Sequence, residues 1–127
     1  MSIPVSIPSA ISDLSLYFFS LAQYPDEDVL DAAEKERLRR FVPENVKRRF
    51  AAAHTRLRNI LAVPAQTLPE LLIFGAGKFG KPYLKDYPHI SFSLSHSEDM
   101  GFLAVCAKGA EIGADIEKIR EQIQNIE

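Results

Sequence analysis

The sequence predicts an α+β fold, in which about two helices near the N-terminus pack on a mainly antiparallel sheet. Apolar residues recur at helical spacing only before residue 62, whereas the segments after residue 68 alternate or are continuously apolar, as strands are. This order of helices before strands favours an α+β fold over a doubly wound α/β fold. With 127 residues, of which 46% are apolar and 25% charged, the chain is long enough for a single domain, residues 1–127, and too short for two.

The helical region follows an apolar, aromatic stretch at residues 14–21, which predicts a buried strand. Asp26 or Asp28 is expected to cap the first helix, and Pro43 to open the second. The second helix has the clearest pattern, because its apolar residues fall on one stripe: Val46, Phe50, Ala53, Leu57, Ile60 and Leu61. Residues 64–69 are expected to form a linker.

The remaining segments are typical of strands and turns. Residues 70–74 predict a strand, and residues 75–82 predict a glycine-rich turn. Strict alternation over residues 90–95 places apolar side chains on one face and three serines on the other. Residues 102–107 are apolar on both faces, so we expect a central strand in which Cys106 is a small core residue.

Basic residues are concentrated in the helical region. Nine of the fifteen lysines and arginines lie between Lys35 and Arg58, where only Glu36 and Glu44 oppose them. The stretch therefore carries +7, and the rest of the chain carries −9. Such a stretch attracts phosphate-bearing partners, although a solvated helix face is the simpler interpretation of a charge run alone. The overall charge of −2 excludes a protein whose whole surface binds nucleic acid.

The composition also indicates the cellular compartment in which the protein is expected. The apolar runs are too short for a transmembrane helix, and the first residues lack the basic region and long apolar stretch of a signal peptide. One cysteine excludes a disulfide framework and a multi-thiolate metal site. We therefore expect a cytoplasmic protein that does not enter a membrane.

A pair of carboxylates marks the last strand-like segment, residues 112–117. Alternation would place Asp115 and Glu117 on one strand face, about 6–7 Å apart along the strand, with the glycine at Gly113 leaving room for a ligand. Two carboxylates so placed can hold a hard cation, and Mg²⁺ suits them because it also bridges to substrate phosphates. A solvated acidic edge strand that pairs with Lys118 is the alternative.

Hydroxyls and an imidazole end the alternating strand, at Ser95, His96 and Ser97. A nucleophilic serine with a histidine base is one option, but neighbouring residues of a strand point to opposite faces and so pair poorly. A phosphate-binding site is a second option, because hydroxyls, backbone amides and a protonatable ring meet there. A polar loop with an ordinary surface histidine is the third.

The glycine-rich segment 75–82 is not a Walker A loop, because Lys81 is followed by Pro82 rather than by Ser or Thr. It also lacks the strand–loop–helix setting of a dinucleotide fingerprint. What it does offer is a cation, Lys81, held between Gly80 and Pro82.

The order of these segments resembles the 4′-phosphopantetheinyl transferases of the surfactin-synthetase (Sfp) type. That family carries a basic helix followed by G-K-P, F-N-x-S-H-S and G-x-D-x-E motifs. The corresponding segments here are Arg48-Arg49-Phe50, Gly80-Lys81-Pro82, Phe92-Ser93-Leu94-Ser95-His96-Ser97 and Gly113-Ala114-Asp115-Ile116-Glu117. The resemblance covers roughly residues 30–120, and three linked motifs are far more specific than a charge pattern. Ser93 replaces the usual asparagine.

Length is the larger departure from that family. Its members are about twice as long and consist of two similar halves with the active site between them. Their second half carries a third acidic metal ligand and a lysine, and nothing in this sequence matches that segment. The resemblance therefore implies the N-terminal half of the pseudo-dimeric fold, without the C-terminal half and incomplete for catalysis on its own.

The family moves the phosphopantetheine arm of coenzyme A onto a serine of an acyl or peptidyl carrier protein. By resemblance, Asp115 and Glu117 are catalytic residues that hold Mg²⁺ against the pyrophosphate. Lys81 and Pro82 match the loop beside the adenine and phosphates of coenzyme A. The resemblance thus implies a magnesium-dependent transferase with coenzyme A as substrate and a carrier protein as partner.

Three further residues match coenzyme A contacts of the family. Ser95 and His96 match residues that grip its phosphates, where a cationic His96 is favoured by the phosphate charge. Arg49 matches a helix position near the 3′-phosphate, and an arginine suits phosphate geometry.

Two other functions fit the same residues. The chain could be a non-catalytic module that binds coenzyme A or the acidic helix of a carrier protein through its basic helix. Alternatively, the face left by the missing half could expose apolar surface, and two copies could then form a homodimer that imitates the complete fold.

Overall fold

The computed structural model describes residues 5–7 and 14–107, and it contains two antiparallel sheets and two α-helices. In chain order the elements are β1 (Val5–Ile7), β2 (Leu14–Ser20), α1 (Ala32–Arg40), α2 (Glu44–Ala65), the 3₁₀ turn η1 (Pro69–Leu71), β3 (Phe74–Ala76), the 3₁₀ turn η2 (Lys78–Gly80), β4 (Pro82–Leu84), β5 (Ser91–Ser97) and β6 (Met100–Cys106). The larger sheet has the order β1-β2-β6-β5, and β3 and β4 form a separate hairpin. The predicted α+β class is confirmed.

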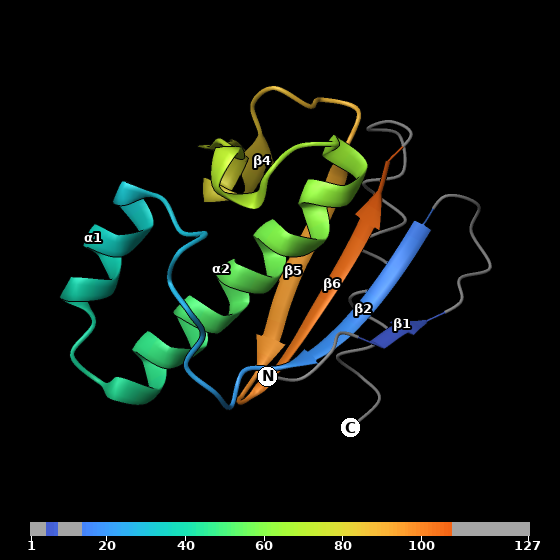
Figure 1. Ribbon diagram of the computed structural model, residues 1–127. Helices are drawn as coiled ribbons and strands as arrows, with labels where there is room; N and C mark the ends of the chain where they lie inside the picture. The colour runs from blue at the N-terminus through green and yellow to red at the C-terminus, as the bar shows by residue number, and fades with distance from the viewer. Residues whose placement is uncertain (1–4, 8–13, 108–127) are drawn as a thin grey trace.

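Helix α2 lies across one face of the four-stranded sheet, and α1 lies beside α2 (Figure 1). No helix in the described ranges is both long enough and apolar enough to cross a membrane.

The predicted central strand is confirmed as β6, which pairs antiparallel with both β2 and β5. On the α2 face of β6, Leu103 is fully buried and Gly101 lies beneath the ring of Phe19. A Cβ atom added at Gly101 would collide with that ring, so the strand needs a glycine at this position. On the opposite face Cys106 is fully buried, as expected for a core residue.

A tight turn joins β5 to β6, so that His96 pairs with Gly101 and Ser97 with Met100. Glu98 occupies this turn at a φ of 51°, a left-handed conformation that few side chains adopt. The backbone oxygen of Asp99 accepts a hydrogen bond from the amide of Leu21 over 2.7 Å. The turn is thereby joined to the chain segment that follows β2.

Helix α1 begins at a capping box rather than at either predicted cap. Asp31 accepts a hydrogen bond from the Glu34 amide over 2.8 Å, and Glu34 accepts one from the Asp31 amide over 2.9 Å. The prediction of Asp26 or Asp28 was wrong because the turn before the helix uses them instead: Asp26 accepts a hydrogen bond from the amide of Asp28. The capping box satisfies two amides that the first turn of a helix otherwise leaves unpaired.

Helix α2 begins at Glu44, after Pro43, and ends at Ala65. The predicted linker at residues 64–69 was wrong at both ends, because Pro64 lies in the last helical turn and Pro69 opens η1. The C-cap residue is Gln66, which adopts a left-handed conformation and whose backbone amide donates to the carbonyls of Ala62 and Val63. Pro64 therefore does not stop helix α2, which continues to Ala65.

The main core lies between α2 and the sheet. The buried residues that form it are Phe19, Leu21, Ala52, Ala53, Leu57, Leu61, Ala62, Ala65, Leu72, Leu84, Ile90, Phe92, Leu103 and Val105. The predicted stripe of α2 supplies Ala53, Leu57 and Leu61 to this core. Val46, which was assigned to the same stripe, is exposed because it precedes the part of α2 that covers the sheet.

The segment that leads into the β3–β4 hairpin differs from its prediction. A strand was expected at residues 70–74, but this segment contains the 3₁₀ turn η1, and β3 begins only at Phe74. The predicted turn is present within the hairpin, where Gly80 has a φ of 75°. Tyr83 packs against the backbone of Gly75, which leaves no space for a side chain there.

Candidate functional site

A pocket of about 270 Å³ lies between the two α-helices and β5, and we call it the helix pocket. Its walls combine cationic and apolar side chains: Arg37, Phe41, Val46, Arg49, Phe50, Ala53, His54, Leu94 and His96. None of the residues in this set is acidic, so the pocket is suited to an anion.

Arg49 reaches the helix pocket from α2 and is held by the β5–β6 turn. Its Nε donates to Oδ1 of Asp99 over 2.9 Å, and Arg48 donates to the same oxygen over 2.5 Å. The hydrogen bonds from Arg49 and Arg48 hold the pKa of Asp99 below its ordinary value. Arg48 also donates to the carbonyl of Leu21, so the two arginines fix α2 against the turn.

His96 reaches the same pocket from β5. Its strand partner is Gly101, and its side chain shares the α2 face with Phe92 and Leu94. Alternation turns Ser95 to the opposite face, where its strand partner is Phe102. The expectation that Ser95 and His96 would not pair as nucleophile and base is therefore supported by the strand geometry.

A buried ion cluster, which no local sequence pattern predicted, supports the wall of the pocket. Arg58 is fully buried and donates to Oε1 of Glu34 over 2.7 Å and to Oδ2 of Asp31 over 2.8 Å. It also donates to the carbonyls of Pro69 and Leu72. The Asp-x-x-Glu pattern of the capping box was the available signal, but nothing local indicated that Arg58 would reach it.

Glu34 connects this cluster to the pocket through His54. Nδ1 of His54 lies 2.8 Å from Oε2 of Glu34, and the imidazole stacks on Phe50 with ring centroids 4.0 Å apart. Burial opposes the ionisation of Glu34, but the hydrogen bonds from His54 and the Asp31 amide and the charge of Arg58 outweigh it and lower the pKa. Glu34 is therefore a carboxylate at neutral pH.

The predicted basic stretch is not a uniformly solvated face. Arg39 and Arg40 are exposed and pair with Glu36, as that interpretation requires. Arg56 and Arg58, by contrast, are buried. Arg37 lies over the ring of Phe50, with its Cζ 4.9 Å from the centroid, and so keeps a cation at the edge of the helix pocket.

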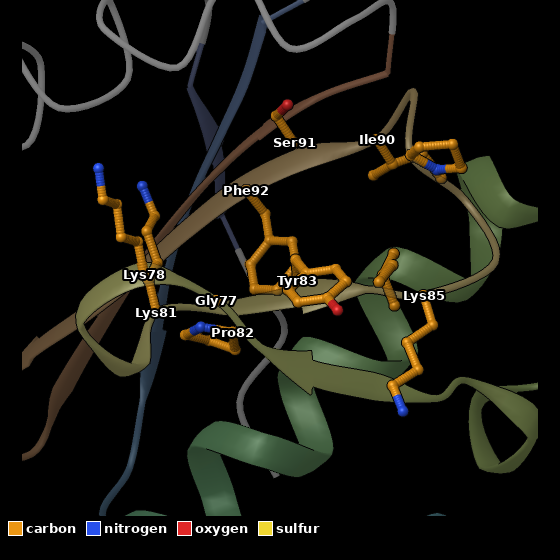
Figure 2. A pocket seen from close by; sticks show the side chains of 11 residues that line it. Gly77, Lys78, Lys81, Pro82, Tyr83, Lys85, Ile90, Ser91 and Phe92 are labelled. Carbon is orange, nitrogen blue, oxygen red and sulfur yellow. The ribbon is translucent and has the colours of Figure 1, made fainter.

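A second pocket, of about 400 Å³, lies between the β3–β4 hairpin and the start of β5, and we call it the hairpin pocket (Figure 2). Lysine side chains and an apolar floor line it: Gly77, Lys78, Lys81, Pro82, Tyr83, Leu84, Lys85, Pro88, Ile90, Ser91 and Phe92. Figure 2 shows the side chains of Lys78 and Lys81 extending in the same direction at one end of the pocket, which Tyr83 and Phe92 also line.

The structure thus places the predicted residues in different surroundings. Arg49 and His96 meet in the helix pocket, whereas Lys81 and Pro82 line the hairpin pocket. Asp115 and Glu117 lie outside the described residues, as does the predicted strand at 112–117. Within the described part of the chain, no group of three or more histidine, cysteine or acidic residues could hold a metal ion.

Comparison with known proteins supplies the remaining evidence. No family model matches the chain. A 4′-phosphopantetheinyl transferase of Bacillus subtilis is 33% identical over 92 residues, which is 72% of this chain and 40% of that protein. A second one from the same organism is 29% identical over 72% of this chain and 40% of its own length.

A fungal protein extends the comparison. The L-aminoadipate-semialdehyde dehydrogenase-phosphopantetheinyl transferase of Eremothecium gossypii is 33% identical over 94 residues, which is 73% of this chain and 33% of that protein. The chain thus spans between a third and two fifths of the length of these curated relatives. Over that part of their length, the chain is similar in sequence to proteins named as 4′-phosphopantetheinyl transferases.

Proposed function

We propose that this chain forms part of an enzyme that transfers 4′-phosphopantetheine from coenzyme A to a serine of an acyl or peptidyl carrier protein. The similarity to proteins named as 4′-phosphopantetheinyl transferases, over about 70% of the chain, carries the proposal. The helix pocket supports it, because Arg49 and His96, two residues assigned to phosphate binding, line one cationic pocket although they are far apart in the sequence.

The helix pocket would bind a phosphate of coenzyme A. Arg49 keeps its charge at every physiological pH and has donors in a planar fork that matches phosphate oxygens. A phosphate beside His96 would favour the protonated imidazole. Asp99 uses the Nε of Arg49, which leaves the outer nitrogens of the fork as the donors for a ligand.

The hairpin pocket would bind the adenine end of the same molecule. Phe92, Ile90 and Leu84 provide an apolar floor for a flat base, and the lysines at the rim provide charge for phosphates. Lys81 and Pro82 lie at this rim, where the resemblance expects the coenzyme contacts.

The proposal also includes a magnesium site. Asp115 and Glu117 would hold Mg²⁺, for which carboxylate oxygens are suitable ligands. When bound, the ion would neutralise charge on the pyrophosphate during its attack by the carrier serine. Ser95 lies on the opposite face of β5 from His96, so its hydroxyl would not reach a phosphate bound in the helix pocket.

The chain would correspond to one half of a pseudo-dimeric transferase, namely the N-terminal half. On this proposal the base and the remaining lysine come from a C-terminal half, and the isolated chain binds coenzyme A without completing the reaction.

Transfer of labelled phosphopantetheine from coenzyme A to a purified carrier protein tests the proposal. The reaction is run with this chain alone and with a supplied C-terminal half of a related transferase. Labelling that needs both parts and Mg²⁺, and that is lost in Asp115→Ala, is expected. No labelling with the added half would contradict the transferase function, and size-exclusion chromatography of the chain alone would show whether a homodimer replaces the missing half.

Binding is measured separately by calorimetry with coenzyme A, with and without Mg²⁺. Arg39→Leu is the matched control, because Arg39 is exposed and lies outside both pockets. Loss of affinity in Arg39→Leu equal to that in Arg49→Leu would indicate general charge attraction rather than a site.

A further inference from the structure

His54 occupies a position in the helix pocket that the resemblance does not assign. It lies on α2, lines the pocket together with Arg49 and His96, and keeps about a quarter of its side chain exposed. Stacking on Phe50 fixes the plane of the ring, and the hydrogen bond to Glu34 fixes its rotation in that plane. His54 is therefore a rigidly held imidazole at the pocket wall.

The partner of His54 fixes its tautomer. Glu34 is held as a carboxylate by Arg58 and by the Asp31 amide, and a carboxylate can only accept hydrogen bonds. Nδ1 of His54 is therefore the donor in this pair, and the neutral ring carries its one proton there. Nε2 is then an acceptor in the neutral ring and a donor in the protonated ring.

The state of Nε2 decides what the pocket wall offers to an anion. A neutral His54 presents a lone pair, which repels a phosphate oxygen. A protonated His54 presents an N–H and a positive charge, which together make a charge-assisted hydrogen bond to phosphate. The carboxylate of Glu34 lies at Nδ1, on the other side of the ring.

We infer that His54 is a proton-dependent phosphate ligand of the helix pocket, so that the pocket binds a phosphate group more tightly when His54 is protonated. The inference rests on the proposed function, because it takes the helix pocket as a phosphate site. It adds a second histidine to that site and makes its affinity depend on pH through a residue outside the family motifs.

The other charged groups around His54 do not supply the same dependence. Arg37 and Arg49 line the pocket and stay charged across the physiological range, as does Arg58 behind Glu34. Asp31 and Asp99 are carboxylates bound to arginines. His96, on β5, is the other group of the pocket lining that can change charge near neutral pH, so the experiment must separate it from His54.

The test uses the 127-residue chain and adenosine 3′,5′-bisphosphate as the probe, with affinities measured at pH 6 and pH 8. His54→Gln and His96→Gln remove the two histidines of the pocket in turn. His89→Gln is the control, because His89 is exposed and lines neither pocket. The ratio of variant to wild-type dissociation constants at each pH cancels the titration of the probe itself.

We expect His54→Gln to weaken binding about tenfold at pH 6, the size of one lost charge-assisted hydrogen bond, and by less than about twofold at pH 8. His96→Gln should leave the remaining pH dependence of His54 visible, and His89→Gln should change neither value. Equal weakening by His54→Gln at both pH values, or no weakening at either, would overturn the inference. Thermal unfolding of each variant checks that the fold is retained.

A second readout separates this inference from the proposed function. Nitrogen NMR of the histidine rings is recorded while inorganic phosphate is added at pH 6. A shift of the Nε2 resonance of His54 supports the inference even if the nucleotide does not bind, in which case the coenzyme site fails. Nucleotide binding that leaves the His54 resonances unchanged overturns the inference and leaves the coenzyme site standing.

Discussion

Arg58 and Glu34 form an ion pair inside the protein, with the Nε of Arg58 donating to Oε1 of Glu34 over 2.7 Å and no part of the arginine side chain exposed. The pair joins α1 to α2, and the same guanidinium also reaches Asp31 and the carbonyls of Pro69 and Leu72. One side chain thus connects the start of α1, the middle of α2 and the segment that precedes β3.

Replacement of Arg58 should therefore be strongly destabilising. Arg58→Leu leaves Glu34 buried without its cation, and we expect a loss of about 3–5 kcal/mol in the free energy of unfolding, measured with urea. Arg39→Leu is the matched control, since Arg39 is exposed and its pair with Glu36 should contribute less than about 1 kcal/mol. Equal losses in the two variants would contradict a structural role for the buried cluster.

A second prediction concerns the capping box at the start of α1. Asp31→Ala removes the cap of α1 and one partner of Arg58, so it should destabilise the protein by more than the roughly 1 kcal/mol of a lost cap alone. Asp31→Asn keeps the capping oxygen and should lose less. Asp28→Ala alters a residue that does not cap the helix, and its effect on unfolding should stay within about 0.5 kcal/mol. A larger effect at Asp28 than at Asp31 would restore the original prediction of the cap.

Because Glu34 is ionised in the folded protein, we expect the free energy of unfolding to depend on pH. Because the folded state lowers its pKa below the ordinary value of 4.5, the carboxylate contributes stability at higher pH and loses it as the pH falls through the lowered value. The stability difference between the wild type and Glu34→Gln should therefore be largest near neutral pH and shrink below about pH 4.5. Urea unfolding across pH 3–7 measures it, and a difference that stays constant would show that Glu34 is not ionised in the folded protein.

Close packing at Gly101 makes a fourth prediction. Gly101→Ala would drive a methyl group into the ring of Phe19, and overpacking of this kind costs about 1–3 kcal/mol. A smaller residue at position 19 should relieve the collision. Unfolding measurements on Gly101→Ala, Phe19→Leu and the double variant form a double-mutant cycle, and additive effects would refute the contact.

The proposed phosphate site makes the fifth prediction. Arg49→Leu should weaken binding of adenosine 3′,5′-bisphosphate about tenfold or more, because a hydrogen bond to a charged group is lost. Arg49→Lys keeps the charge without the planar fork and should be intermediate. Calorimetry measures both, and unchanged affinity in Arg49→Leu would exclude the helix pocket as the phosphate site.

The elements with strong periodic patterns could be predicted from the sequence. Spacing alone predicted three elements: strand β2, the apolar stripe of α2 and the apolar strand β6. In each of them, the positions of the apolar residues indicate which face or faces are buried. The cap of α1 and the end of α2 were missed. Several aspartates near the start of α1 could each have capped it, and α2 continues through Pro64 to Ala65 although a proline lacks the amide donor of a helical residue.

The candidate site was predictable only in part. Arg49 and His96 were identified from motifs, but their meeting in one pocket depends on the packing of α2 against β5. The roles of Arg58, Glu34 and His54 could not be predicted, because contacts between residues 20 or more positions apart leave no local pattern. Charge counting treated Arg58 as one more cation of the basic stretch, although burial removes it from the surface.

The opposite orientation of Ser95 and His96 has a consequence for how this region tolerates insertions. Because the tight turn fixes the register of His96 against Gly101, one extra residue inside β5 would exchange the faces of the side chains before the insertion, and would move Phe92 out of the core. Two extra residues in the turn at Glu98 would leave the strand pairing intact but would displace Asp99, which holds Arg48 and Arg49. Functional variants of this chain should therefore keep a constant number of residues between Ser91 and His96 and a turn of constant length.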